Sequence, residues 1–143
     1  MRRPGLLIAS FPVVVGLLLV ACGEKAPEEH TIAEPATVEP IEGSNVARLT
    51  VTASAAERLD LQTAPVEVRQ GRTEIPAGAV LYGPRGREWV YTSPQPLVFV
   101  RASISVDRFE GDVAVLSAGP PPGTQVATVA VAELYGIEFE IGH

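Results

Sequence analysis

Apolar and polar residues alternate in short runs through most of this chain, a pattern that predicts β-strands separated by turns. The longest run covers residues 97–106, where every even position is apolar and Arg101, Ser103 and Ser105 hold odd positions. A period of two places alternate side chains on opposite faces of a strand. We therefore expect a strand here that buries only its even face.

Turn residues divide the other runs into strands of a few residues each. Glycines at both ends of the loop 83–86 predict a hairpin between residues 79–82 and 88–92. Ser54 and Glu57 have the spacing of a capping box, which predicts one short helix over residues 55–59. Further strands are expected over residues 48–52, 62–69, 113–116, 125–132 and 137–141. This succession favours a mainly β fold, a small antiparallel β-sandwich or barrel with one short helix.

The first 21 residues have the pattern of a secretory signal peptide. Arg2 and Arg3 precede an apolar stretch over residues 6–21, which is shorter than the ~20 residues of a membrane-spanning helix. The stretch ends in Leu-Val-Ala-Cys at positions 19–22 and resembles the lipobox of bacterial lipoproteins. The resemblance implies cleavage before Cys22, a lipid on its sulfur, and a place on the extracytoplasmic (periplasmic) side of the cell membrane. A plain transmembrane anchor with a chance cysteine is the alternative.

Residues 22–46 form a lipid-anchored linker that we expect to be disordered. They contain three prolines and six glutamates but few large apolar residues. Such a segment buries too little apolar surface to offset the entropy that is lost on ordering. The β domain is therefore expected to occupy residues 47–143.

Charge and cysteine content narrow the classes of partner. The chain has 11 basic and 17 acidic residues, and loss of Arg2 and Arg3 with the signal peptide leaves a net charge near −8. An acidic surface repels nucleic-acid phosphates, so we expect no nucleic-acid partner. It also argues against a polybasic membrane patch, so the membrane is expected to be bound through the N-terminal lipid. Cys22 is the only cysteine, which excludes a disulfide framework.

No group of residues points to catalysis, a metal or a cofactor. A Gly-x-Ser-x-Gly nucleophile motif is absent. The two histidines, His30 and His143, lie in the linker and at the C-terminus, and the only methionine is Met1. Soft metals need thiolate or thioether ligands, and the single thiol is expected to carry lipid. We therefore expect a protein that is not an enzyme and that holds no metal ion or cofactor.

Aromatic residues are the remaining candidates for a binding surface. Trp89, Tyr91 and Phe99 lie in predicted strands, where core packing is the favoured interpretation and a protein-contact surface the alternative. Tyr82 and Tyr135 each stand beside a predicted turn, where a rigid sheet commonly presents binding residues. We select Tyr82 and Tyr135 as candidate partner-contact residues, with core packing as their alternative.

The order of the turn and strand motifs resembles one protein family. Ile-Pro-Ala-Gly-Ala-Val-Leu at 75–81, Gly-Arg-Glu-Trp-Val-Tyr at 86–91, Asp-Arg-Phe-Glu-Gly-Asp at 107–112 and a Gly-x-x-x-Gly loop at 119–123 follow one another. Together they resemble the membrane-proximal domain of periplasmic adaptor subunits, also called membrane fusion proteins, of resistance-nodulation-division efflux pumps. The resemblance covers residues 48–143. The lipoyl domain and α-hairpin of a full adaptor have no counterpart here.

This resemblance implies an accessory or adaptor-like subunit of an efflux system, which would bind an inner-membrane transporter. Without the α-hairpin, the chain is not expected to bridge two membranes by itself. A small ligand-binding extracytoplasmic lipoprotein, with a pocket in its β domain, is the alternative function. A deep apolar cavity would favour that alternative.

Overall fold

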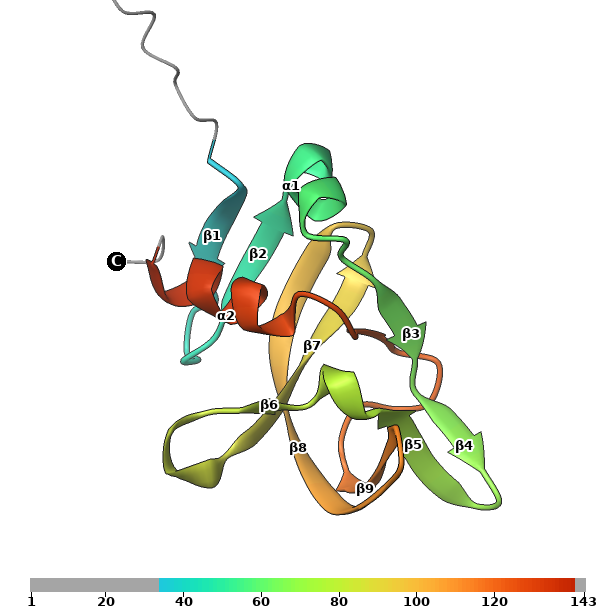
Figure 1. Ribbon diagram of the computed structural model, residues 1–143. Coiled ribbons are helices and arrows are strands. Elements are labelled where there is room, and N and C mark those ends of the chain that lie inside the picture. The colour runs from blue at the N-terminus through green and yellow to red at the C-terminus, as the bar shows by residue number, and fades with distance from the viewer. Residues whose placement is uncertain (1–33, 141–143) are drawn as a thin grey trace, which may run out of the picture. The chain divides into compact units, whose positions relative to one another are not determined.

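The computed structural model describes residues 34–140, and half of this part of the chain is in strands (Figure 1). The strands are β1 (Ala36–Pro40), β2 (Ala47–Val51), β3 (Thr63–Pro65), β4 (Glu67–Arg69), β5 (Arg72–Pro76), β6 (Leu81–Tyr82), β7 (Glu88–Gln95), β8 (Val98–Glu110), β9 (Val113–Ala118) and β10 (Gln125–Ala127). The helices are α1 (Ala53–Arg58) and α2 (Val131–Glu140), with 3₁₀ turns η1 (Ala77–Ala79) and η2 (Pro84–Gly86).

The sheet curls into a nearly closed antiparallel barrel because consecutive strands β3 and β4 pair with its two different edges. The strand order is β3-β10-β7-β8-β9-β5-β4. The β4–β5 ladder ends at the pair Glu67 and Glu74, and two positions further along the same register Pro65 would face Pro76. Neither proline has an N–H to donate, so the ladder stops and β3 pairs with β10 instead. The expected fold class, a small β-barrel with one short helix, is confirmed.

Strands β7 and β8 bury both of their faces, one in each of two hydrophobic clusters. The barrel cluster is wholly aliphatic: Val66, Ile75, Ala79, Val90, Ile104, Ala114, Leu116 and Val126. The helix cluster lies against α1 and α2: Ala36, Leu49, Val51, Ala55, Tyr91, Phe99, Ala127, Val131 and Leu134. Phe99 and Ile104 belong to opposite faces of β8, yet both are buried. The expectation that residues 97–106 bury only their even face is therefore wrong, because this strand separates two clusters.

The first described strand lies in the segment that was expected to be a disordered linker. β1 pairs with β2 along its whole length, and Ala36 is 2% exposed. The linker prediction is therefore wrong for residues 36–46. Overall glutamate and proline content hides the local alternation of Ala36 and Val38 with polar neighbours, which is the pattern of a half-buried strand. Residues 22–33 lie outside the described part of the chain.

The C-terminal segment is a helix where a strand over residues 137–141 was expected. The buried residues of α2 are Val131, Leu134 and Glu138, at the three- and four-residue spacing of one helix face. Over only five residues, the alternation of Ile137 and Phe139 does not discriminate between the two periods. The strand expected over residues 125–132 is also shorter than predicted. As β10 it ends at Ala127, and α2 begins at Val131, inside the expected range.

Helix α1 begins two residues before the predicted start, because a different residue caps it. Thr52, and not Ser54, is the N-cap, and its Oγ1 accepts a hydrogen bond from the backbone N of Ala55 at 3.1 Å. Within residues 34–140, neither α-helix has the length and apolar character that crossing a membrane requires.

Two other local predictions are confirmed. The hairpin around residues 83–86 is present, with β6 pairing to β7 across it. Trp89, Tyr91 and Phe99 are core residues, at 7%, 0% and 2% exposed. Their aromatic surface is therefore used for packing, and the contact-surface alternative does not hold for these three.

Candidate functional site

The sequence selected three site residues, and the structure describes two of them. Cys22 lies outside the described residues, so its lipidation stays a prediction. Tyr82 ends β6 in the β6–β7 hairpin, and Tyr135 lies in α2. Figure 1 shows that hairpin at the lower left and α2 above it, so the two tyrosines lie on separate elements.

The β6–β7 hairpin holds Tyr82 in a fixed and exposed position. Tyr82 is 57% exposed. The backbone N of Gly83 donates to the carbonyl oxygen of Arg87 across the loop at 2.8 Å. Directly after the loop, Glu88, which pairs with Tyr82, accepts a hydrogen bond at its Oε2 from the backbone N of Val106 at 2.7 Å, which fastens β7 to β8. Core packing therefore does not account for Tyr82.

Tyr135 is half-buried and packs at the margin of the helix cluster. Its ring centroid lies 4.5 Å from that of Phe139, and the guanidinium carbon of Arg101 lies 5.9 Å from its centroid. Packing accounts for the conformation of Tyr135. Tyr82 is therefore the stronger of the two candidate contact residues.

Beneath these aromatic rings lies a buried ion pair between Arg101 and Glu138, each 6% exposed. The two side chains form a bidentate contact, with Nε to Oε2 at 3.0 Å and Nη2 to Oε1 at 3.2 Å. Glu138 also accepts from the Tyr91 hydroxyl (2.5 Å) and the backbone N of Ala47 (3.3 Å). Arg101 Nη2 donates in addition to the carbonyl oxygen of Asn45 (3.1 Å). Each carboxylate oxygen thus has two donors, which offsets much of the cost of burying the charges.

This ion pair fixes α2 on the sheet. Burial, together with the hydrogen bond and charge of Glu138, raises the pKa of Tyr91 far above its usual value, so its hydroxyl stays protonated as a donor. Because both oxygens of Glu138 are occupied, the cluster has no free acceptor for a substrate. The strand expected over residues 137–141 would place Glu138 on a polar, solvated face, so the sequence did not predict this pair. Nothing local in the sequence marks two residues 37 positions apart as partners.

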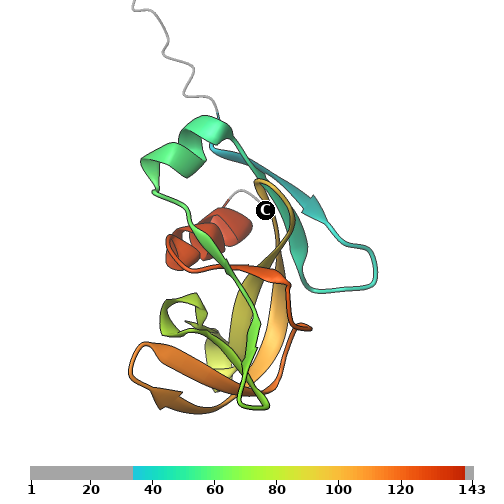
Figure 2. The same cartoon turned by 90° about the vertical axis from the view of Figure 1, so that its right-hand side faces the viewer.

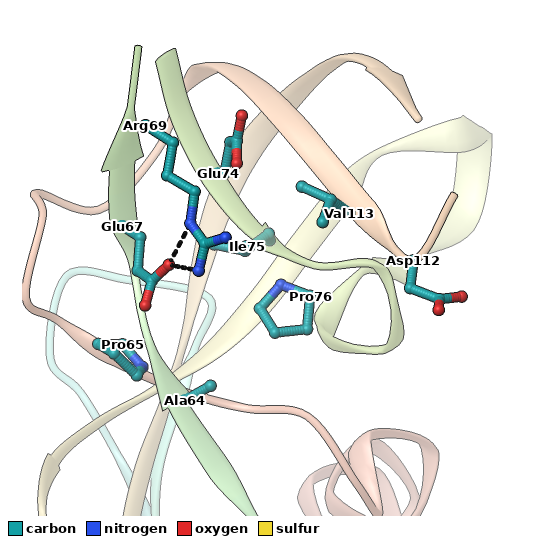
Figure 3. Close-up of a pocket in the computed structure, with 9 residues that line it drawn as sticks. All are labelled: Ala64, Pro65, Glu67, Arg69, Glu74, Ile75, Pro76, Asp112 and Val113. Carbon is teal, nitrogen blue, oxygen red and sulfur yellow. Dashed lines mark hydrogen bonds and ion pairs between the residues drawn. The ribbon is translucent and has the colours of Figure 1, made fainter. Parts of the chain in front are cut away.

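A slot of about 190 Å³ opens where β3 separates from β5 (Figure 3). Pro65 and Pro76 line it, together with acidic residues and Arg69. Arg69 Nε donates to Glu67 Oε2 at 2.7 Å, so this arginine is already paired. The volume is smaller than the roughly 300–1,000 Å³ of small-molecule sites. We interpret the slot as the result of incomplete barrel closure and assign no ligand to it.

A network of charged side chains covers the outer face of β5 and β8. Arg72 pairs with Glu74 and with Glu110, both at 3.0 Å, and Arg108 pairs with Glu110 at 2.7 Å. The hydrogen bond from Arg108, followed by the charge of Arg72, lowers the pKa of Glu110. Contacts with Glu110 and Asp107 raise the pKa of Arg108 in return. Acids and bases neutralise one another here, so no pair of free carboxylates is set up for acid–base catalysis.

Two depressions flank α2. One, of about 390 Å³, lies between α1 and α2, and the other, of about 180 Å³, lies between the β1–β2 hairpin and the end of α2. Within residues 34–140, no three histidine, cysteine, aspartate or glutamate side chains are grouped closely enough to hold a metal ion.

No family model, curated protein or solved structure matches this chain. The resemblance to efflux adaptors therefore stays a prediction, which depends on the order of the motifs along residues 48–143.

Proposed function

We propose that this protein is a lipid-anchored extracytoplasmic accessory subunit of a resistance-nodulation-division type efflux system, and that it acts by binding protein. The observation that carries the proposal is the exposure of Tyr82. At 57% it is the most exposed large apolar side chain among the described residues, on a hairpin that hydrogen bonds fix to the sheet. Aromatic residues presented on a rigid support are typical of protein-interface hot spots. The lipobox and the motif order support the location and the kind of transporter.

The protein would act by holding its β domain close to the membrane surface, where the transporter lies. β1 begins 14 residues after Cys22. A chain of that length reaches at most about 50 Å when fully extended. A lipid on Cys22 would therefore keep the domain within that distance of the membrane surface. Confinement of this kind raises the effective concentration of a binding module near a membrane partner without any new contact.

One observation favours the alternative of a small ligand-binding lipoprotein. The depression between α1 and α2, at about 390 Å³, falls within the size range of small-molecule sites. Its wall is mainly apolar, but Arg58, Glu133 and Glu140, all exposed to solvent, also line it, and it is an open depression rather than a deep cavity. A defined small molecule that raises the melting temperature of the protein would favour this alternative.

Photocrosslinking in native membranes tests the proposal. A photoreactive residue at position 82 should form adducts with an inner-membrane transporter. Position 68 in β4 is the matched control, because Val68 is similarly exposed, at 54%, but lies in the β4–β5 hairpin. Position 135 should give fewer adducts than position 82, because Tyr135 is half-buried. No transporter adduct at position 82, or equal adducts at 68 and 82, would contradict the proposal.

The lipid anchor has a separate test. Intact-mass analysis of the native protein should show a chain that begins at Cys22 and carries added acyl mass. Replacement Cys22→Ser should release the protein from the membrane fraction. An unmodified chain beginning at Met1 in its native host would rule out the anchor without bearing on the role of Tyr82.

A further inference from the structure

The depression between α1 and α2, here called the helix groove, is lined by apolar residues of both helices together with two glutamates and one arginine. It is about 390 Å³ in volume, and its lining includes Ala55, Arg58, Glu133, Gly136, Ile137 and Glu140. Figure 2 shows α1 and α2 on the same side of the domain. The four α2 residues follow one another at spacings of three, one and three, so they form a single stripe along that helix.

The glycine in this stripe is not explained by the fold of the domain. Gly136 lies within α2, and its φ is not positive, so no special backbone conformation requires it. A Cβ placed on Gly136 would meet no atom within 4 Å, so no internal contact requires it either. Glycine weakens a helix relative to alanine. Its effect here is to leave open space beside Ala55, where the backbone of another chain can approach closely.

The net charge of the domain is concentrated around this groove. The buried pair of Arg101 with Glu138 is neutral and is left out of this count. Residues 34–62 and 128–140, which include both helices, then carry seven acidic residues and two arginines, whereas residues 63–127, which include most of the barrel, carry six acidic residues and five arginines. Glu133 and Glu140 are exposed at the two ends of the α2 stripe. A cationic partner therefore complements this half of the domain, and an anionic bilayer surface does not.

We propose that the helix groove binds a short cationic helix of a partner protein. The small or aliphatic face of that helix lies over Gly136 and Ile137, and its lysine or arginine side chains reach Glu133 and Glu140. These glutamates are seven residues apart, about 10 Å along the axis of α2, which basic residues seven positions apart on a partner helix match. The groove is separate from the Tyr82 hairpin, so the inference does not depend on the efflux proposal.

Peptide titration of the purified lipidated protein in a neutral detergent tests this inference. The probe is a fluorescein-labelled peptide, acetyl-KLAKALAKLAKALA-amide, and its acidic twin carries glutamate at each lysine position. Fluorescence anisotropy should show binding of the basic peptide, weakened by salt because exposed charges are screened, and no binding of the acidic twin. Micelles of the same detergent without the protein serve as the control for adsorption of the peptide to detergent.

Matched variants separate binding from folding. Gly136→Leu fills the groove, and it should weaken peptide binding at least about tenfold while the melting temperature stays the same or rises. Glu140→Lys should also weaken binding, whereas Asp112→Lys, an equal change of charge at an exposed position outside the groove, should not.

Three results would overturn the inference. The first is unchanged affinity in Gly136→Leu. The second is equal loss of affinity in Glu140→Lys and Asp112→Lys, which would mean non-specific attraction. The third is much tighter binding to a chain that ends at Glu140, which would mean that residues 141–143 occupy the groove.

Discussion

The two hydrophobic clusters lie on opposite faces of β7 and β8, and they are built in different ways. The barrel cluster contains only aliphatic side chains. The helix cluster contains Tyr91 and Phe99, and the Arg101–Glu138 ion pair lies against it and attaches α2. Apolar packing needs little more than the right volume and pattern, whereas a buried ion pair is stable only when all of its partners are in place. The position of α2 therefore depends on a few directional contacts in addition to the packing of Val131 and Leu134, whereas the barrel cluster depends on packing alone.

The largest expected effect is the loss of Glu138. Glu138→Ala leaves Arg101 buried without its partner, and we expect a loss of about 3–5 kcal/mol in the free energy of unfolding. Urea denaturation of the purified protein measures it. The double replacement Arg101→Met with Glu138→Leu should recover part of this loss, because no charge then remains buried. If Glu138→Ala costs no more than an exposed replacement, the ion pair does not hold α2.

In the barrel cluster, Ile75→Ala should cost about 2–5 kcal/mol through lost burial and the cavity that remains. Ile75→Val should cost only about 0.5–1.5 kcal/mol. The graded response distinguishes packing from a directional network, because it follows the volume removed. Denaturation of both variants by urea is the measurement, and equal losses in the two would contradict the comparison.

Tyr91 makes the free energy of unfolding depend on pH. Its pKa is raised in the folded state by burial and by Glu138, so its stabilising contribution is complete below the unfolded phenol's pKa, near 10. Above about pH 10 the unfolded phenol ionises while the buried one does not. Stability should then fall as pH rises, by up to about 1.4 kcal/mol per pH unit. Tyr91→Phe should remove this part of the slope in urea titrations between about pH 9 and pH 11. A slope that persists in Tyr91→Phe would assign it to another group.

Gly136→Ala should stabilise the protein. Replacement of a helix-interior glycine by alanine is worth up to about 1 kcal/mol, and the structure offers open space for the new methyl group. The melting temperature should rise, by about 4–8 °C at most for a domain of this size. A fall in melting temperature would show that the fold itself requires the glycine.

The smallest effect is expected on the outer face of the barrel. Arg108 and Glu110 are paired but solvent-exposed, so Glu110→Gln should leave the urea midpoint unchanged within error. The difference in midpoint between Glu110→Gln and wild type should stay near zero when salt is added. If Glu110→Gln lowered the free energy of unfolding as much as Glu138→Ala does, the distinction between buried and exposed ion pairs would be wrong.

The elements that were predicted correctly are those with local signals. The 83–86 hairpin has glycines at both ends, and the aromatic residues of β7 and β8 lie in strongly apolar runs. The errors lie where a distant partner decides. From the sequence alone, Glu138 has the pattern of a polar strand position, and it is buried because it pairs with the distant Arg101. The segment of β1 has the composition of a linker, and it forms a strand because it pairs with β2.

The contrast between local signals and distant partners also applies to the two candidate binding surfaces, the Tyr82 hairpin and the helix groove. Tyr82 was selected as a candidate because a turn beside an aromatic residue is a local pattern, and the side chain is 57% exposed in the structure, while its contact role stays a prediction. The helix groove was not anticipated, because it needs Ala55 of α1 and Gly136 of α2 to face one depression, and α2 itself was expected to be a strand. Sequence pattern alone does not bring two helices together across 81 residues.

Co-purification from solubilised native membranes tests the central claim most directly, that this protein acts by docking on a transporter through Tyr82. Wild type, Tyr82→Ala and Val68→Ala would be isolated in equal amounts, after their melting temperatures have been shown to be equal. The membrane proteins bound to each would then be quantified by mass spectrometry. We predict that an inner-membrane transporter accompanies wild type and Val68→Ala and is depleted about tenfold or more with Tyr82→Ala. Equal recovery of the transporter with Tyr82→Ala, or no transporter with any of the three, would contradict the claim.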